Sequence, residues 1–363
     1  MEIMELNKIK FKNFWKKKKV FITGHTGFKG GWLSLWLNIL GAEVKGYSLQ
    51  PTSKKNFYYE TGLNNIIQSE YGNILNKKKL NQSINKFKPE IIFHLAAQSL
   101  VIDSYLDPIK TYKTNVIGTL NLLNIIQTSK GIKAFINITS DKCYENPKNK
   151  NKLSENDQMG GHDPYSSSKG CVEILTASIR RSFFSDNHQT SIATVRAGNV
   201  IGGGDWSKNR LIPDIVRKIS KDKNIILRNP ISVRPWQFVL DPLFGYMILA
   251  TKLYNNGHEY SEAWNFGPGL NDNKNVKWIA TKLLKKWNSK NIRIISSKSM
   301  FHEEKLLYLN SKKALSKLKW KTFYDVDKTL NVVVDWYKSS LNKENMLSLS
   351  QKQINDYMQN LFH

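Results

Sequence analysis

Short apolar runs alternate with helical patterns along the first half of the chain. Residues 20–23 form a β-branched and aromatic run that predicts a buried strand ending at a glycine. Residues 32–40 are too apolar for a surface helix, so they predict a helix packed on a sheet, and Gly41 marks its end. The other elements that the pattern predicts here are strands at 44–49, 91–95 and 134–138 and helical structure around 112–127.

This alternation predicts an α/β fold with a doubly wound parallel sheet, covered by helices on both faces. Ligands of such sheets bind at the carboxyl ends of the strands. After residue 196 the chain changes to a glycine-rich turn and shorter elements, which predicts a smaller lobe. The expected division is a main domain of residues 1–198 and 235–264, and a smaller lobe of residues 199–234 and 265–363.

Three glycines stand between the first strand and the first helix. Gly24, Gly27 and Gly30 form a GxxGxxG motif, in which glycine permits a tight turn and a close approach to a pyrophosphate. The N-terminus of the following helix attracts anions. The motif therefore predicts a Rossmann-type dinucleotide-binding domain, although a glycine turn without a ligand is the alternative.

The end of the second predicted strand leaves the choice of dinucleotide open. An acidic side chain at this point would bind the ribose 2′-hydroxyl of NAD, but the chain has Ser48, Leu49 and Gln50 there. Gln50 can bind a ribose without repelling a phosphate, and Lys54 and Lys55 are near enough in sequence to tolerate one. These residues therefore leave the choice between NAD and NADP open.

A second group of polar residues follows the strand predicted at 134–138. Residues 139–144 read Thr-Ser-Asp-Lys-Cys-Tyr and fall at the carboxyl edge of the sheet, and Tyr165 and Lys169 are one helical turn apart. A hydroxyl, a tyrosine and a lysine near a nicotinamide would form a redox site. Lys169 and the cationic nicotinamide favour the phenolate, which predicts a lowered pKa for Tyr165.

The composition describes a globular protein with a large basic excess. Its 363 residues are 40% hydrophobic and 11% aromatic, and 55 Lys and Arg face 29 Asp and Glu for a net charge of +26. Only eight of the basic residues are Arg, and the lysines are scattered. Neither pattern is typical of a nucleic-acid footprint, so no nucleic-acid partner is expected.

The cysteines and the apolar segments indicate a cytoplasmic protein. Cys143 and Cys171 cannot form a disulfide framework, and neither has the spacing of a metal site, so no metal is expected. Charges interrupt residues 1–19, which argues against a signal peptide, and no run approaches the roughly 20 apolar residues of a membrane span. We therefore expect a soluble protein with no membrane partner.

Together these motifs resemble the extended short-chain dehydrogenase/reductases that modify nucleotide sugars. The resemblance rests on the glycine motif, Ala96-Ala97-Gln98, Asn115 and the Tyr165/Lys169 pair. It is closest to the CDP-glucose 4,6-dehydratases, extends to His302, and covers most of the chain. The blocks that carry it are 24–37, 139–146, 159–170, 196–206, 210–215, 228–237 and 263–268.

The resemblance implies dehydration of CDP-glucose to CDP-4-keto-6-deoxyglucose through an internal NAD redox cycle, in a homodimer or higher homo-oligomer. It makes Tyr165, with Ser140 and Lys169, the group that deprotonates the sugar, and Asp141 the acid that releases water. Lys142 is either the base at carbon 5 or a charge that stabilises the enolate. The residues implied for the cofactor are Gly24, Thr26, Gly27, Phe28, Lys29, Gly30, Asn73, Ile74, Ala96, Ala97, Gln98, Asn115, Tyr165 and Lys169. Those expected for the substrate are Gln98, Asn199, Arg210, Arg234 and His302.

Two other functions remain open from the sequence, and some positions depart from the family pattern. A nucleotide-sugar 4-epimerase, or a dehydratase of another nucleotide hexose, would share the glycines, Tyr165 and Lys169; Asp141 argues against epimerisation, which needs no acid at carbon 6. A silent NAD-binding or nucleic-acid-associated protein would not need the full redox set.

The departures from the family pattern are the lysine- and asparagine-rich run 147–152, residues 102–103, and Asn73, which stands where Asp usually meets the adenine.

Overall fold

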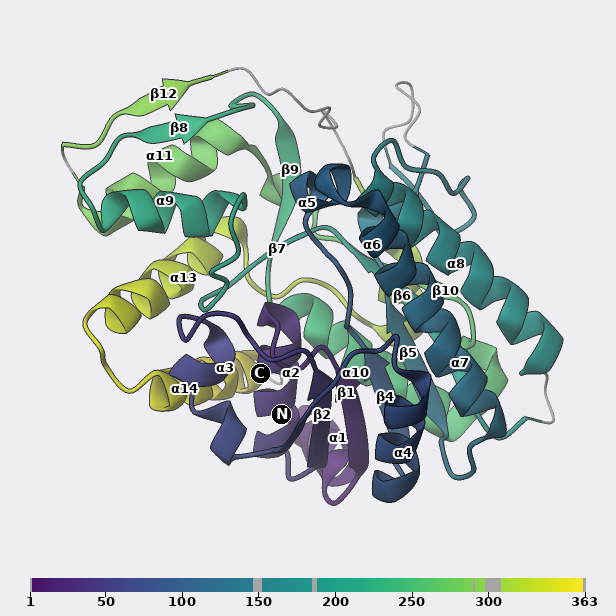
Figure 1. Cartoon of the computed structure of the whole chain (residues 1–363). Helices are drawn as coiled ribbons and strands as arrows, with labels where there is room; N and C mark the ends of the chain where they lie inside the picture. The colour runs from purple at the N-terminus through teal and green to yellow at the C-terminus, as the bar shows by residue number, and fades with distance from the viewer. Residues whose placement is uncertain (1, 146–151, 185–187, 290, 298–307, 362–363) are drawn as a thin grey trace.

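A parallel sheet forms the centre of the molecule (Figure 1). The computed structural model describes the chain except for residues 1, 146–151, 185–187, 290, 298–307 and 362–363. Seven strands lie in the order β10-β6-β5-β4-β1-β2-β3, and every neighbouring pair is parallel. Their bounds are β1 (Lys19–Thr23), β2 (Glu43–Ser48), β3 (Gln68–Tyr71), β4 (Ile91–His94), β5 (Ala134–Ile138), β6 (Ser191–Ala197) and β10 (Ala263–Phe266). The predicted doubly wound α/β fold is confirmed.

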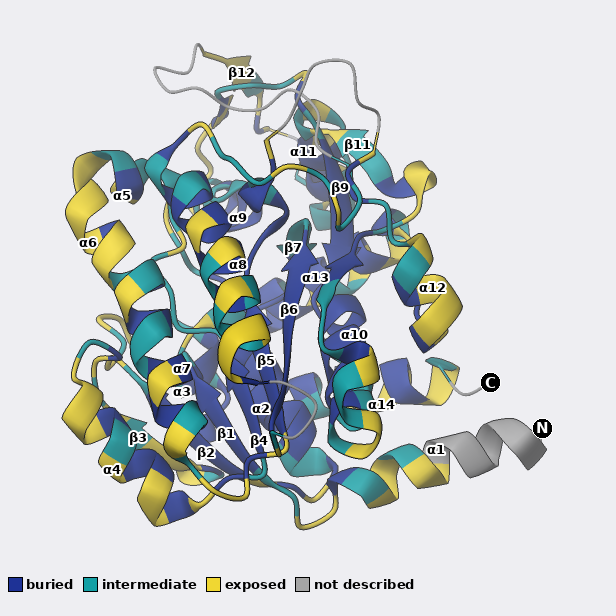
Figure 2. Ribbon diagram, turned by 90° about the vertical axis from the view of Figure 1, so that its right-hand side faces the viewer, coloured by how far each residue is buried: buried dark blue, intermediate teal, exposed yellow. Residues whose placement is uncertain are grey.

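Helices cover both faces of this sheet, because its strands are apolar on both sides. Phe21 of β1 belongs to a core that includes residues of α4 (Lys77–Phe87) and α7 (Gly118–Thr128). Val20 and Ile22 belong to a second core with α2 (Phe28–Ile39) and α10 (Leu240–Asn256). Figure 2 shows the buried strands between helices whose outer faces are exposed. No helix in the described part of the chain is long and apolar enough to cross a membrane.

A smaller lobe stands beyond the carboxyl edge of the sheet (Figure 1). Strand β9 (Val233–Phe238) pairs with β7 (Asn199–Ile201) and β11 (Asn273–Asn275), and β8 (Ile225–Leu227) pairs with β12 (Ile294–Ser296). The remaining elements are α1 (Glu2–Trp15), α3 (Phe57–Glu60), η1 (Leu63–Asn65), α5 (Val101–Leu106), α6 (Pro108–Tyr112), η2 (Lys113–Ile117), η3 (Asp141–Cys143), α8 (Pro164–Phe183), α9 (Leu211–Ile219), η4 (Gly257–Tyr260), η5 (Leu270–Asp272), α11 (Val276–Trp287), α12 (Lys312–Leu318), α13 (Val326–Leu341) and α14 (Met346–Leu361).

The chain crosses between these two parts several times. Strand β10 returns to the edge of the main sheet, and Tyr357 of α14 packs edge-on against Trp36 of α2, with ring centroids 5.6 Å apart. The order of the strands reverses between β1 and β4, where a crevice opens at the carboxyl ends. The topology therefore predicts a ligand-binding site between this edge and the lobe. The exact domain boundaries stay a prediction.

Candidate active site

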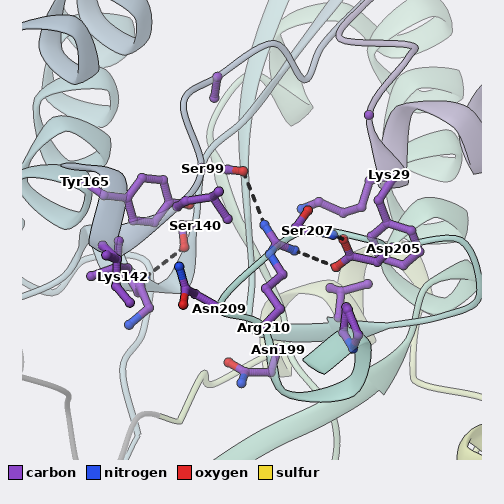
Figure 3. A pocket seen from close by; sticks show the side chains of 18 of the residues that line it. Lys29, Ser99, Ser140, Lys142, Tyr165, Asn199, Asp205, Ser207, Asn209 and Arg210 are labelled. Atoms are coloured by element: carbon purple, nitrogen blue, oxygen red, sulfur yellow. Dashed lines mark hydrogen bonds and ion pairs between the residues drawn. The ribbon is translucent and has the colours of Figure 1, made fainter. Parts of the chain in front are cut away.

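A cavity of about 1350 Å³ runs from the carboxyl edge of the sheet into the smaller lobe. Its walls come from the turn after β1, the segments after β2, β4 and β5, the start of α8, and the region from β7 to β9. Figure 3 shows that Ser140, Tyr165, Asn199 and Arg210, which come from different elements, point toward this space. This volume is ample for a dinucleotide together with a second ligand.

The glycine turn forms one end of the cavity, and its shape depends on glycine. Gly24 has a φ of +80°, and a Cβ there would lie 2.7 Å from the backbone nitrogen of Ala96. A Cβ on Gly30 would lie 2.1 Å from the carbonyl oxygen of Gly24. Gly27, the N-cap of α2, offers no side chain to cap the helix, so its first amide groups are left for a ligand. This cradle fits a pyrophosphate.

The segments after β2 and β3 line the cavity beside this cradle. Ser48, Leu49, Asn73 and Ile74 all line it. Thr26 Oγ1 lies 2.8 Å from Ser48 Oγ, and the Asn73 side chain accepts a hydrogen bond from the amide of Leu75. No carboxylate stands at the end of β2, so the ribose would meet hydroxyl and backbone groups here.

The segment after β4 is held by a reciprocal amide contact. The backbone amide of Gln98 donates to Asn115 Oδ1 at 2.8 Å, and Asn115 Nδ2 donates to the backbone carbonyl of Gln98 at 3.0 Å. Asn115 lies in the π-helical turn η2 and also donates to Ser168 Oγ of α8. Ala96 and Ala97 line the cavity, whereas Gln98 and Asn115 support its wall from behind.

Ser140 and Asp141 follow β5 and are both buried. The Ser140 hydroxyl donates to Asp141 Oδ1 at 3.0 Å and accepts from the amide of Lys142 at 3.2 Å, so it also begins the short helix η3. Burial raises the pKa of Asp141 above its ordinary value, against the opposing effects of the Lys142 charge and the Ser140 hydrogen bond. A buried carboxyl group with a raised pKa is suited to donate a proton.

Tyr165 and Lys169 reach the same space from the first turns of α8. Asp163 caps this helix by accepting from the amide of Ser166 at 3.0 Å, and Lys169 Nζ donates to the carbonyl of Ile138 at 3.2 Å. Burial lowers the pKa of Lys169 to about 8. Burial also raises the pKa of Tyr165 to about 12, and the hydrogen bond with Ser140 only partly opposes this. In the chain alone, loss of hydration therefore outweighs nearby charge at Tyr165. The lowering of its pKa expected in the presence of a cationic nicotinamide stays a prediction.

The lobe contributes basic and amide groups to the opposite wall. Arg210 forms an ion pair of 3.2 Å with Asp205 and donates to Ser99 Oγ at 3.3 Å, so it bridges the lobe and the segment after β4 (Figure 3). Arg234 is 9% exposed, and its charge partly opposes the rise in the Asp141 pKa that burial causes. Asn199 lies in β7 and lines the cavity. The lobe thus brings donors to the site at the end of β5.

Comparison with known proteins defines the family of this chain. The family model for GDP-mannose 4,6 dehydratase matches residues 21–332. The chain belongs to this family. It is 48% identical to CDP-glucose 4,6-dehydratase of Salmonella typhimurium over 351 residues, which cover 96% of this chain and 98% of the relative. It is also 26% identical to dTDP-D-glucose 4,6-dehydratase of Dictyostelium discoideum, over 67% of this chain and 59% of that one.

Solved structures of similar proteins share the fold. UDP-glucose 4-epimerase from Thermotoga maritima, solved with UDP-glucose, has a TM-score of 0.78 at 21% identity, over 89% of this chain and 99% of that one. dTDP-glucose 4,6-dehydratase from Bacillus anthracis, solved with NAD, has a TM-score of 0.75 at 20% identity, over 91% of this chain and 99% of that one. Dehydratases and epimerases thus use one architecture.

Most site residues expected from the sequence meet at the cavity. Those that line it are Gly24, Thr26, Gly27, Phe28, Lys29, Gly30, Asn73, Ile74, Ala96, Ala97, Ser140, Asp141, Lys142, Tyr165, Lys169, Asn199, Arg210 and Arg234. Gln98 and Asn115 do not line it, and their part in binding stays a prediction. His302 and most of the run 147–152 lie outside the described residues.

Several lining residues were not expected from the sequence. Asp205 and Asn209 come from the glycine-rich turn and the loop that follows it, and Lys221, Lys223 and Arg228 from the region around β8. The only available signal was the density of basic residues between 217 and 228. This cluster of basic residues could not be distinguished from the lysines that are scattered over the rest of the chain.

Proposed function

We propose that the chain converts CDP-glucose to CDP-4-keto-6-deoxyglucose, with NAD as a cofactor that is used and restored in each cycle. The observation that carries this proposal is the meeting of two sets of groups in one cavity. Ser140, Tyr165 and Lys169 suit oxidation of an alcohol, and the buried Asp141 beside Lys142 suits loss of water. The 48% identity to a CDP-glucose 4,6-dehydratase supports the choice of substrate.

The chain's own groups at the glycine turn would hold the cofactor. The turn at Gly24, Gly27 and Gly30 and the first amides of α2 would receive the pyrophosphate, and Asn73 and Ile74 would hold the adenine side. Ser48 and Leu49 offer the ribose neither a carboxylate nor a cation, and the NAD-bound relative supports NAD over NADP. Bound there, NAD would supply reversible hydride transfer, from carbon 4 of the sugar and back to carbon 6.

Tyr165 takes the proton of the hydroxyl on carbon 4. Burial raises its pKa in the chain alone, and the Ser140 hydrogen bond and the Arg210 charge only partly oppose this. The phenolate therefore depends on further positive charge, which we expect from Lys169, one helical turn away, and from a cationic cofactor. Ser140, whose hydroxyl donates to Asp141 in the chain alone, would turn that proton toward the phenolate or the sugar oxygen to stabilise it. The oxidation at carbon 4 leaves a ketone, which acidifies the hydrogen on carbon 5.

Asp141 and Lys142 complete the dehydration. Asp141 donates a proton to the hydroxyl that leaves carbon 6, so that it departs as water. The proton on carbon 5 passes to the neutral amine of Lys142, or to water while the Lys142 charge stabilises the enolate. Protonation at carbon 5 and hydride return to carbon 6 give the 4-keto-6-deoxy sugar. A 4-epimerase would need no such acid.

The nucleotide is proposed to bind between the sheet and the lobe of residues 199–234 and 265–363. Arg210, Arg234 and Asn199 offer guanidinium and amide donors to a diphosphate. Incubation with CDP-, dTDP-, UDP- and GDP-glucose plus NAD, followed by NMR, tests both the reaction and the base. A 6-deoxy-4-keto product from CDP-glucose supports the proposal; turnover of another nucleotide sugar alone, or epimerisation, contradicts it.

We further propose that two copies of the chain associate through the outer faces of α6, η2 and α8. Ile109 and Ile174 are 68% and 60% exposed there, and Ile109, Tyr112 and Ile117 surround a shallow apolar pocket. Such a patch marks an interaction surface. Light scattering should give a dimer, and Ile109→Lys should yield monomers while Ile231→Lys, at an exposed position elsewhere, should not. A monomeric wild type would refute this.

A further inference from the structure

A carboxylate lies behind the proposed redox residues, on the same face of α8. Tyr165, Lys169 and Glu173 follow one another at intervals of four residues, so they form one row along the helix. Glu173 is only 3% exposed and does not line the cavity. Glutamate is almost never buried to this extent without a partner. Because Glu173 does not line the cavity, any part it plays in the reaction must act through its neighbours and not through contact with the substrate.

The two oxygens of Glu173 tie α8 to two strands of the sheet. Oε1 accepts a hydrogen bond from Thr139 Oγ1, directly after β5. Oε2 accepts from Thr194 Oγ1 at 2.7 Å and from Arg196 Nη2 at 2.7 Å, both in β6. Thr139 is the residue before Ser140. The carboxylate therefore anchors the start of the segment that carries the proposed catalytic residues.

Arg196 extends this anchor to the other end of the same segment. Its Nη1 donates to the Tyr144 hydroxyl at 2.5 Å and to the carbonyl of Glu155 at 3.1 Å. Tyr144 in turn donates to Asn265 Oδ1 at 2.7 Å in β10. Residues 139 and 144 are thus both fixed by one buried ion pair, with Ser140, Asp141 and Lys142 between them.

Stability alone is a weak reason for this arrangement. A buried ion pair loses hydration that its attraction barely offsets, and apolar residues would serve the core as well. Burial by itself would raise the pKa of Glu173, but the Arg196 charge and the hydrogen bonds outweigh it and lower the pKa below its ordinary value. The site therefore keeps a negative charge one helical turn behind Lys169.

We propose that Glu173 is a positioning residue for the reaction, which fixes the segment 139–144 through Thr139 and the Arg196–Tyr144 contact and keeps Lys169 protonated by its charge. The effect on rate rests on the proposed function. The effect on Lys169 does not. A cationic Lys169 favours the Tyr165 phenolate, so the carboxylate assists the proton transfer without touching the substrate.

The other ionisable groups around Lys169 cannot take over this role. Lys29 of α2 and His94 of β4 can only be neutral or positively charged, so neither favours a charged Lys169. Cys143 of η3 is a thiol, and burial raises its pKa well above its ordinary value. Burial lowers the pKa of Lys169 to about 8, and Glu173 opposes that lowering more than the thiol does. Glu173 is thus the main charge that favours the ammonium form.

The test measures the protonation of Lys169 directly in Glu173→Gln. The protein is treated briefly with acetic anhydride over a pH series, and acetylation of Lys169 is quantified by mass spectrometry. The midpoint of Lys169 acetylation should fall by about one pH unit or more, because the loss of a nearby opposite charge shifts a pKa by about 1–3 units. In turnover assays the ascending limb of the kcat profile should move to higher pH, with about tenfold loss on that limb.

Glu155→Gln is the matched control. The Glu155 carboxylate accepts a hydrogen bond from the backbone amide of Asn265, the residue to which Tyr144 donates. Glu155 is not among the groups that shift the pKa of Lys169. The Lys169 midpoint should then stay unchanged. If Glu173→Gln fails to fold, the double variant Glu173→Gln/Arg196→Gln leaves no unpaired charge and should still lower the midpoint.

Each outcome decides one question. An unchanged midpoint in a folded Glu173→Gln variant, or an equal shift in Glu155→Gln, overturns the assignment of Glu173. A lower midpoint with an unmoved kcat profile overturns the link between Lys169 and Tyr165. If the wild type dehydrates no nucleotide sugar, the proposed function fails, while a lowered midpoint would still support the role of Glu173 toward Lys169.

Discussion

The two ends of the cavity handle charge in opposite ways. At the end of β5, Ser140, Asp141, Tyr165 and Lys169 are all less than 9% exposed, and burial displaces the pKa values of the three ionisable groups among them. At the lobe end, Lys221 and Lys223 are exposed and make no ion pair with any described residue. The environment of the first end shifts pKa values, and the second end presents lysine charges that can attract an anion.

This difference predicts which substitutions should affect the chemical steps and which should affect binding. Removing a buried group changes the free energy of a proton transfer, because little water is present to screen or replace it. Removing an exposed cation costs little, because water and salt already screen it. The effects on turnover should therefore decrease from the β5 end of the cavity toward the lobe.

The largest effect is expected at the buried end, from Tyr165→Phe. The variant keeps the ring but cannot take the proton from carbon 4, so turnover should fall by about 10²- to 10⁴-fold. Calorimetry should show that CDP-glucose binding survives. Near-normal turnover would mean that Tyr165 only packs.

Asp141→Asn should separate the two chemical roles of the buried end. An amide keeps the size of the carboxyl group but cannot protonate the leaving hydroxyl, so turnover should fall by about 10²-fold or more while oxidation at carbon 4 continues. Absorbance of reduced nicotinamide should then rise in a single turnover. Wild-type dehydration, or no reduction despite normal binding, would contradict the assignment.

A smaller effect is expected where the two ends meet, at Arg210. Loss of a charged donor to the diphosphate should raise KM about tenfold in Arg210→Met with a lesser change in kcat. Arg293, which is exposed and does not line the cavity, provides the control variant Arg293→Met. A change confined to kcat would place Arg210 with the chemistry instead.

The smallest effect should come from the exposed end. Lys221→Gln/Lys223→Gln should lower kcat/KM about two- to fivefold at low salt and have little effect at high salt, as expected of electrostatic steering. The variant Lys78→Gln/Lys86→Gln changes two exposed lysines of α4, away from the cavity. An equal loss in both variants would show that net charge, not the rim, matters.

The buried end was also the more predictable from sequence. The strand at 134–138, the segment after it and the spacing of Tyr165 and Lys169 follow from apolar runs and helical periodicity. Helix α1 and the polar edge strand β3 were not predicted, because neither shows a regular apolar pattern. The pairing of Glu173 with Arg196 and the raised pKa of Tyr165 depend on burial, which no local pattern records.

The most direct test of the central claim follows one hydrogen atom. CDP-glucose that carries deuterium on carbon 4 is incubated with the protein and NAD, mixed with unlabelled substrate, and the products are read by NMR and mass spectrometry. An internal redox cycle predicts deuterium in the carbon 6 methyl group of the same molecule, with no net NADH. A carbon 6 methyl group without deuterium, or stoichiometric NADH, would contradict it.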